Sequence, residues 1–466
     1  MKFIKIVSIS LIFLSSTILF GQRNFTLYHL EGTPQTHYLN PSFRPSSTVN
    51  VSLPLGMQSV GVSSSAFALN DLIQEREQDD SLEIRLDAVI DLMNDLNHFN
   101  IDVQNEILGV GFRLDDNYFS LGIVNRLQFN FLYPRDLIKL AYEGNGDSFL
   151  GERASFDGLG VNLNSYVEYG IGYNRIIADN LMVGGRVKFL SGIANLRTTR
   201  SVFGVHTDSE TFDITIDGSA RINTSNISPL ISFEDEDEEN GNNENDDFSP
   251  HVYAYNFNNF GMGLDLGASY VVNDKLLISA SMNDLGFINW SSNTHNFETN
   301  EIDFAYRGVN FGGFLEDSLD VFEQLADTMR TVFSGTDNRE AYSTSLYTRF
   351  FIGGRYQVTE KIGATALLYN EIVNGRYRAG FHVGANLKLG QWLSACLNYG
   401  YYGRSWTNIG AGLSLRGGPV QFFVGMDNMI AAISPESQRN FHLTTGLTLM
   451  FGKPDKQKEP GVMKFK

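Results

Sequence analysis

From about residue 105 to the end of the chain, apolar and polar residues alternate with a period of two. The clearest segment is 376–389, in which one face includes Tyr377 and Phe381 and the other includes Arg376 and Arg378. Such alternation is typical of β-strands that have two different faces. The alternating segments run for about 10 to 14 residues, which is longer than the usual strand of a soluble β-sandwich. We therefore predict a transmembrane β-barrel and keep a soluble sandwich as the alternative.

The connections between these segments support a closed antiparallel barrel. Six short turns alternate with seven longer connections, so both termini fall at the same end, which an even number of strands requires. Pro54 cannot donate to a strand ladder and makes the first strand the weakest. The prediction is an all-β fold of about fourteen strands, at approximately 49–63, 105–114, 118–131, 165–177, 181–192, 261–272, 275–289, 346–358, 361–373, 376–389, 391–401, 406–416, 419–427 and 440–451.

The first residues of the chain read as a secretory signal. Lys2 and Lys5 precede an apolar run from Ile6 to Phe20, and Gly21 offers a small residue for cleavage. The run is short for a membrane helix, although an uncleaved anchor helix is the alternative. We expect residues 1–21 to be removed and the mature protein to leave the cytoplasm.

Composition excludes several other classes of protein. The formal net charge of −18 disfavours nucleic acid as a partner, because phosphate binding needs a basic surface. A single cysteine among 466 residues rules out a disulfide framework. The mean hydropathy of −0.15 is too polar for a bundle of membrane helices.

The polar faces of the predicted strands carry an unbalanced charge. Nine basic residues face the lumen, against the three acidic residues Glu168, Asp265 and Glu371. Confined positive charge attracts anions, so we expect an anion site at Arg186, Lys188, Arg376 and Arg378. An error of register in two or three strands would remove this imbalance. The nine basic residues are Arg113, Arg186, Lys188, Arg349, Arg355, Arg376, Arg378, Lys388 and Arg416.

An acidic segment could balance this lumen. Residues 68–97 show apolar residues at helical spacing, and Asp87, Asp91 and Asp95 share another face. We predict an amphipathic helix that plugs the basic barrel mouth, or else a solvated helix lying on outer loops. A second helical stretch is predicted at 314–333, and the acidic run 234–239 is expected to form a solvated loop rather than a calcium site.

Signs of catalysis are absent from the sequence. The eight histidines are scattered, and no zinc-protease, nucleophile-elbow or phosphate-loop motif occurs. His382 and His442 fall on inward faces, but no motif pairs them with a serine. We expect no enzyme, no cofactor and no metal site, and we expect Cys396 to be a small packed residue.

With a barrel predicted, the run Leu39-Asn40-Pro41-Ser42-Phe43 becomes informative. It resembles the Asn-Pro-Ala motif in the N-terminal hatch of FadL-like outer-membrane transporters, which are fourteen-stranded barrels for hydrophobic molecules. The motif also resembles that of PorV-like secretion-channel partners and of an uncharacterised Bacteroidota family of predicted barrels. The resemblance implies a hatch role for Asn40, Pro41 and Ser42, with Ser42 in place of alanine.

These expectations give a domain plan and two functions. The leading one is a Gram-negative outer-membrane barrel with periplasmic termini that binds or passes a hydrophobic or amphiphilic anion. The other is a sealed barrel that acts as partner of a secretion or surface-protein assembly. The predicted units are a signal peptide (1–21), a hatch (22–48), the barrel (49–452) with a helical insert (68–97), an acidic outer loop (223–260) and a helical loop (290–345), and a polar periplasmic tail (453–466).

Overall fold

The computed structural model describes residues 24–45, 47–54, 56–76, 81–146, 148–227, 257–306, 335–373, 375–402 and 405–452. Four predicted features lie outside the described residues: the signal peptide 1–21, the acidic run 234–239, the helix 314–333 and the tail 453–466.

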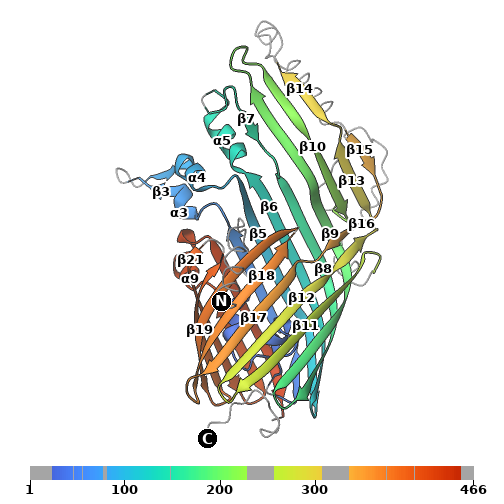
Figure 1. Ribbon diagram of the computed structural model, residues 1–466, viewed down its shortest axis with the longest axis vertical. Helices are drawn as coiled ribbons and strands as arrows, with labels where there is room; N and C mark the ends of the chain where they lie inside the picture. Colours follow the sequence, from blue (N-terminus) through green and yellow to red (C-terminus); the bar gives the residue numbers. More distant parts are fainter. Residues whose placement is uncertain are drawn as a thin grey trace, which may run out of the picture.

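The described chain forms a closed antiparallel barrel of fourteen strands, which confirms the predicted fold class (Figure 1). The first strand is split at Pro54 into β1 and β2, and both parts pair with β5 on one side and β23 on the other. The wall strands are β1 (Val49–Ser52) with β2 (Met57–Ser64), β5 (Leu96–Leu114), β6 (Asn117–Pro134), β8 (Gly160–Ala178), β9 (Leu181–Thr207), β11 (Phe260–Asn273), β12 (Leu276–Trp290), β17 (Thr348–Gln357), β18 (Ile362–Val373), β19 (Arg376–Leu389), β20 (Leu393–Tyr402), β21 (Ser405–Gly417), β22 (Val420–Met426) and β23 (Asn440–Phe451).

The two ends of the barrel differ. At one end, here called the turn end, six short turns join the strands, the longest being residues 358–361. At the other end, the loop end, the connections are mostly longer and carry further elements (Figure 1). These elements are α3 (Leu69–Leu72), β3 (Ile73–Glu75), β4 (Leu82–Ile84), α4 (Leu86–Leu92), α5 (Arg135–Glu143), β7 (Arg153–Ser155), β10 (Ile214–Ser225), β13 (Thr294–Thr299), β14 (Ile302–Tyr306), β15 (Gly335–Asn338), β16 (Tyr342–Ser345), α9 (Ile430–Ile433) and η3 (Pro435–Ser437).

The outer surface of the barrel is apolar and the interior is polar. Outward residues such as Ile352, Leu368 and Leu397 are more than half exposed, whereas the lumen carboxylates Glu168 and Glu371 are fully buried. Aromatic groups lie on the outer wall towards both ends: Phe112, Phe119 and Tyr173 near the turn end, and Phe381, Tyr401 and Trp406 near the loop end. An apolar band between aromatic girdles is the surface of a barrel that spans a membrane. Among the helices that the structure describes, none is both long enough and apolar enough to cross a membrane.

Two sequence predictions about the connections were wrong. The helix over 68–97 is instead two short helices and the small β3–β4 hairpin, and β5 already begins at Leu96. The described parts of 290–345 are not helical but form β13 to β16. With β10 and the far end of β9, β13 to β15 build a sheet that rises beyond the barrel at the loop end (Figure 1).

Candidate functional site

The N-terminal segment fills the half of the lumen nearer the turn end (Figure 1). This segment, residues 24–45, is here called the hatch; it contains α2 (Phe25–His29) and the 3₁₀ helix η2 (Pro34–Tyr38). Its first residues contact Asp427, which directly follows the short strand β22. At its other end, the Pro45 carbonyl lies 2.5 Å from the Arg113 guanidinium near the turn end. The hatch therefore runs from the middle of the lumen towards the turn end, where the chain joins β1.

The predicted hatch motif forms a compact turn against the wall. The Asn40 side-chain oxygen accepts hydrogen bonds from the backbone N–H and the hydroxyl of Ser42, at 2.9 and 2.7 Å. The Pro41 carbonyl accepts a hydrogen bond from Asn174. A Cβ at Gly184 would lie 2.1 Å from that carbonyl, so the wall must be glycine there for the hatch to approach this closely. All three motif residues thus lie in the lumen.

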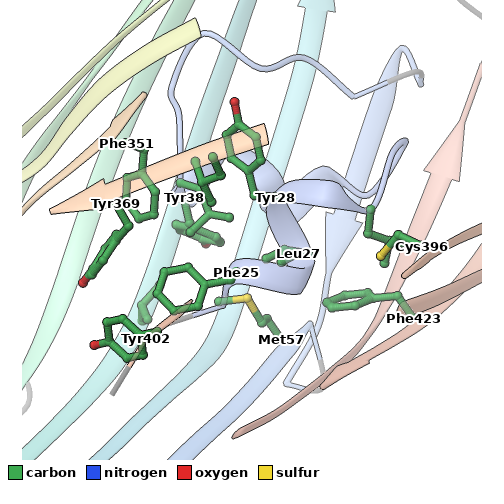
Figure 2. Packing of buried hydrophobic residues seen from close by; sticks show 14 residues of the cluster. Phe25, Leu27, Tyr28, Tyr38, Met57, Phe351, Tyr369, Cys396, Tyr402 and Phe423 are labelled. Atoms are coloured by element: carbon green, nitrogen blue, oxygen red, sulfur yellow. The ribbon is translucent and has the colours of Figure 1, made fainter. Parts of the chain in front are cut away.

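An aromatic cluster surrounds the first residue of α2. The Phe25 ring stacks on His382 with a centroid distance of 4.2 Å and meets Tyr369 and Tyr402 edge to face at 4.9 and 4.8 Å. Figure 2 shows Phe25 next to Tyr402 and Tyr369, with Phe351 beside Tyr369. Edge-to-face pairs add stability beyond the apolar area they bury. The hatch therefore packs one aromatic side chain against three ring side chains of the wall.

Asp427, which follows β22, anchors the start of the hatch. Its carboxylate accepts the backbone N–H groups of Phe25 and Thr26 at 3.1 and 2.7 Å and lies 3.1 Å from the His442 ring. Burial alone would raise the pKa of Asp427, but His442 and the backbone N–H of Thr26 hold it well below its usual range. The carboxylate is therefore charged and fully engaged when the hatch is seated.

Two further hatch residues are anchored nearer the turn end. Glu31 lies 3.2 Å from Arg355 and 3.6 Å from Lys388, and these cations lower its pKa although burial would raise it. Gln35 lies beside the interruption between β1 and β2, where its amide donates to Glu106 at 3.0 Å. The hatch is thus held to several sides of the wall by groups that are buried with it.

A network of buried charges crosses the wall from β6 to β17. Lys188 lies 2.6 Å from Asp265 and also binds Asp284. Glu168 forms ion pairs with Arg186 and with Arg126, the latter at 3.5 Å. Four basic groups and three carboxylates take part: Arg126, Arg186, Lys188, Arg349, Glu168, Asp265 and Asp284. Charges buried this deeply persist only when they are paired.

This network changes the interpretation of the predicted anion site. Arg186 and Lys188 do face the lumen, but both are nearly fully buried and paired with carboxylates. The Arg186 guanidinium also lies over the ring of Tyr38, a hatch residue, at 4.7 Å. Arg186 thus joins the wall to the hatch, and Lys188 joins wall strands to one another. The pair leaves little free positive charge for an incoming anion.

Arg378 has a different setting, because it lines a small cavity above the hatch. The cavity measures about 20 Å³, room for about one water molecule. Arg378 lies 3.7 Å from Glu371, while its Nε has no hydrogen-bond partner among the described residues. Arg376 lies in β19, but its side chain falls outside the described residues. Besides Arg378, the lining is Gly61, Ser63, Asn100, Ile101, Asp102, Gln128, Phe129, Asn130 and Tyr347.

The acidic face predicted to plug the barrel lies elsewhere. Asp87, Asp91 and Asp95 are exposed to solvent. The ion pairs described for Asp87 and Asp95 are with Arg85 and Arg135, neither of which is a lumen residue. This placement agrees with the alternative of solvated elements on the outer loops, while the hatch occupies the lumen.

The hatch also buries two histidines in their neutral form. Burial, followed by the charge of a neighbouring His382, lowers the pKa of His29 to about 3. Burial and nearby Arg186 lower the pKa of His37 to about 4. A histidine in water has a pKa near 6.5, so the released hatch binds protons that the seated hatch does not. The contribution of these two histidines to the stability of the seated hatch is therefore fully present above about pH 6.5 and decreases as the pH falls towards 4.

We expect acid to release the hatch. Each of these histidines should weaken seating by about 3 kcal/mol at pH 4. Cys396 is a natural reporter, because its thiol is buried against the Thr26 carbonyl. A pyridyl disulfide reagent that reacts in acid should therefore modify Cys396 faster at pH 4 than at pH 7. Replacing both histidines with glutamine should flatten this dependence, and an unchanged profile would contradict the assignment.

Comparison with known proteins places the chain in a family. Residues 41–427, most of the chain, match the profile of a "Family of unknown function (DUF5723)". The chain belongs to this family. The matched range begins within the hatch motif, at Pro41, and ends at Asp427, the residue that anchors the start of the hatch. No curated protein matches the chain.

Several solved barrels are similar to this member of the family. The Ralstonia pickettii toluene transporter TbuX is 10% identical, with a TM-score of 0.40, over 90% of this chain and 94% of that one. The Pseudomonas putida toluene transporter TodX is 10% identical, with a TM-score of 0.40, over 93% and 98%. A Pseudomonas aeruginosa FadL homologue is 10% identical, with a TM-score of 0.39, over 93% and 100%. Such low identity carries no substrate over to this chain.

Proposed function

We propose that this protein is an outer-membrane channel whose N-terminal hatch gates the entry of an amphiphilic anion. The observation that carries the proposal is the layering of the lumen above α2. Strand pairing between β18 and β19 places, from the loop end inwards, Glu371 beside Arg378, Tyr369 beside Gly380 and Leu367 beside His382. A charged layer is thus followed by an aromatic layer.

The aromatic layer holds an apolar group of the protein itself. Phe25 packs against Tyr369, Tyr402 and His382, and it belongs to the hatch, a segment that precedes the wall strands in the chain. An apolar molecule that displaced Phe25 would gain the same contacts. The acidic head of such a molecule would lie near the Nε of Arg378, which has no hydrogen-bond partner among the described residues. Charge-assisted hydrogen bonds of this kind are about twice as strong as neutral ones.

The outer membrane is the setting that such a barrel requires. A lipid-exposed chain must satisfy its backbone hydrogen bonds internally, and a closed barrel does so. Outer-membrane barrels have short periplasmic turns and long external loops. The turn end would accordingly face the periplasm, together with the start of β1 and the end of β23.

Binding to Arg378 can be measured with a fluorescent long-chain carboxylate. Arg378→Gln should weaken binding of the carboxylate by about tenfold or more, because a charge-assisted hydrogen bond is lost. Binding of the corresponding neutral alcohol should change little. Arg416→Gln is the matched control, since Arg416 also faces inwards but lies at the turn end, where it bonds the Gly418 carbonyl. Equal losses for the carboxylate and the alcohol would refute the proposed anion site.

A sealed barrel that partners a surface or secretion assembly is the second candidate. The filled lumen and the sheet formed by β9, β10 and β13 to β15 beyond the rim favour it. Under this function the protein would co-purify with another protein and would bind neither the carboxylate nor the alcohol. Extraction of the protein from its native membrane, followed by native mass spectrometry, separates the two candidates.

A further inference from the structure

Three wall residues near the start of the hatch form a series of close polar contacts. The Ser59 hydroxyl lies 3.0 Å from Nε2 of His442, and Nδ1 of the same ring lies 3.1 Å from the Asp427 carboxylate. Ser59 and His442 belong to paired strands, β2 and β23, while Asp427 follows β22. All three side chains are buried and belong to the barrel wall rather than to the hatch.

We propose that Ser59, His442 and Asp427 form a latent acyl-hydrolase site that the hatch keeps closed. The order of contacts is the one that nucleophilic catalysis needs: a hydroxyl beside a base, and the base oriented by a carboxylate. The carboxylate lies 3.1 Å from Nδ1, and Nε2 faces the serine hydroxyl, where it can take the serine proton. This activity does not depend on passage through the barrel, so it goes beyond the channel function proposed above.

The hatch residue Asn24 occupies the position of a substrate carbonyl. Its side-chain oxygen lies 3.1 Å from the Ser59 hydroxyl and also accepts a hydrogen bond from the Thr444 hydroxyl. A hydrolase needs a point within reach of both its nucleophile and a donor to the oxyanion. The Asn24 oxygen marks that point, and Thr444 is the donor. Asn24 thus blocks the site with a carboxamide of its own.

The neighbouring residues indicate an acyl group as the substrate moiety. Met57 lies two residues before Ser59 on the same inward face, and it belongs to a buried apolar cluster with Phe423. An apolar acyl chain would extend into that cluster when Asn24 leaves. The substrate class is therefore an ester of a carboxylic acid with an apolar chain, and the second reactant is water.

The reaction balances with the groups present. The Ser59 oxygen bonds to the ester carbonyl carbon as its proton moves to Nε2 of His442, and Thr444 donates to the oxyanion. The bond to the alkoxy group breaks, and His442 gives the proton to the leaving alcohol. Water then attacks the acyl-serine and loses a proton to His442, which returns it to Ser59 as the carboxylic acid departs.

The test is covalent labelling of the full chain in detergent micelles with an alkyl fluorophosphonate. Asn24 has a positive φ of 53°, so Asn24→Gly removes the blocking carboxamide and keeps the backbone conformation. This variant should be labelled about tenfold faster than the unchanged protein, since the carboxamide's hydrogen bonds no longer hold the site shut. In the Asn24→Gly background, His442→Gln should slow labelling about a thousandfold or more.

Mass spectrometry of the labelled Asn24→Gly protein identifies the modified residue. This measurement does not depend on the folding of a serine variant. Modification of Ser59 is expected, and Ser59→Ala should abolish it. Ser394→Ala should leave it intact, because Ser394 is also buried in the lumen but lies on β20. Two results would overturn the proposal: an unlabelled Ser59 in a barrel whose heat-modifiable migration shows that it is folded, or labelling that His442→Gln leaves unchanged. The three residues would then serve only to anchor the hatch.

Discussion

Deleting residues 24–43 is expected to turn a closed barrel into a conducting pore. The deleted residues supply the apolar and polar groups that fill the lumen, including Phe25, Tyr28, Gln35 and Tyr38. A barrel of eight strands is filled by its own side chains, whereas one of sixteen to eighteen leaves an aqueous channel. Fourteen strands without a plug should therefore conduct ions.

Single-channel recording in planar bilayers measures this effect. The unchanged protein should stay almost closed, and the deletion should raise the mean conductance by at least about tenfold, given the wider lumen. Deleting residues 69–92 is the matched control, because α3, α4 and the β3–β4 hairpin lie outside the barrel at the loop end. Conductance that rises in the control and not in the hatch deletion would place the plug in the acidic segment instead.

The second large effect is expected from Glu168→Gln. Arg186, Lys188 and Arg126 all lie within 4 Å of this carboxylate, and each is almost completely buried. Removing its charge leaves the four cations of the network with two of its three carboxylates, Asp265 and Asp284. Breaking a buried charge network in this way lowers the free energy of unfolding by about 3–5 kcal/mol.

Urea unfolding from lipid vesicles, followed by heat-modifiable migration, gives the measurement. Glu298→Gln is the control, since Glu298 pairs with Arg221 on the exposed sheet beyond the rim and should not move the midpoint. Replacing Glu168 together with Lys188 by an uncharged pair should restore part of the loss. A midpoint unchanged in Glu168→Gln would mean that water reaches the network.

The barrel could be predicted from sequence because its strands alternate over their whole length. The extension of β9 to Thr207 was missed, because the sequence beyond residue 192 lacks a clear apolar face. The insert 68–97 has helical spacing, yet its last residues pair with Pro134 and Tyr133 of β6. Strand pairing with a distant segment outweighed local helix preference there.

The site was predictable only in part. The inward direction of Arg186, Lys188 and Arg378 follows from alternation, but their partners come from elsewhere in the chain. Asp284 has a positive φ of 59° beside a register shift in β12, which breaks the alternation and turns the side chain into the network. Asp427 lies in a connection and not in a strand. No periodic pattern marks such residues, so the predicted excess of positive charge was too large.

The contact between Thr26 and Asp427 joins residues 401 positions apart in the chain. Contacts at such separation form late in folding, because the loop between them must close first. The seam between the split first strand and β23 joins the same two regions. The hatch can therefore be enclosed only when the last hairpin pairs with the first strand. Filling of the lumen and closure of the barrel then occur in the same folding step. A chain interrupted before β23 would lack both, so incomplete copies would expose an unfilled, open-edged sheet to the quality control of the cell envelope.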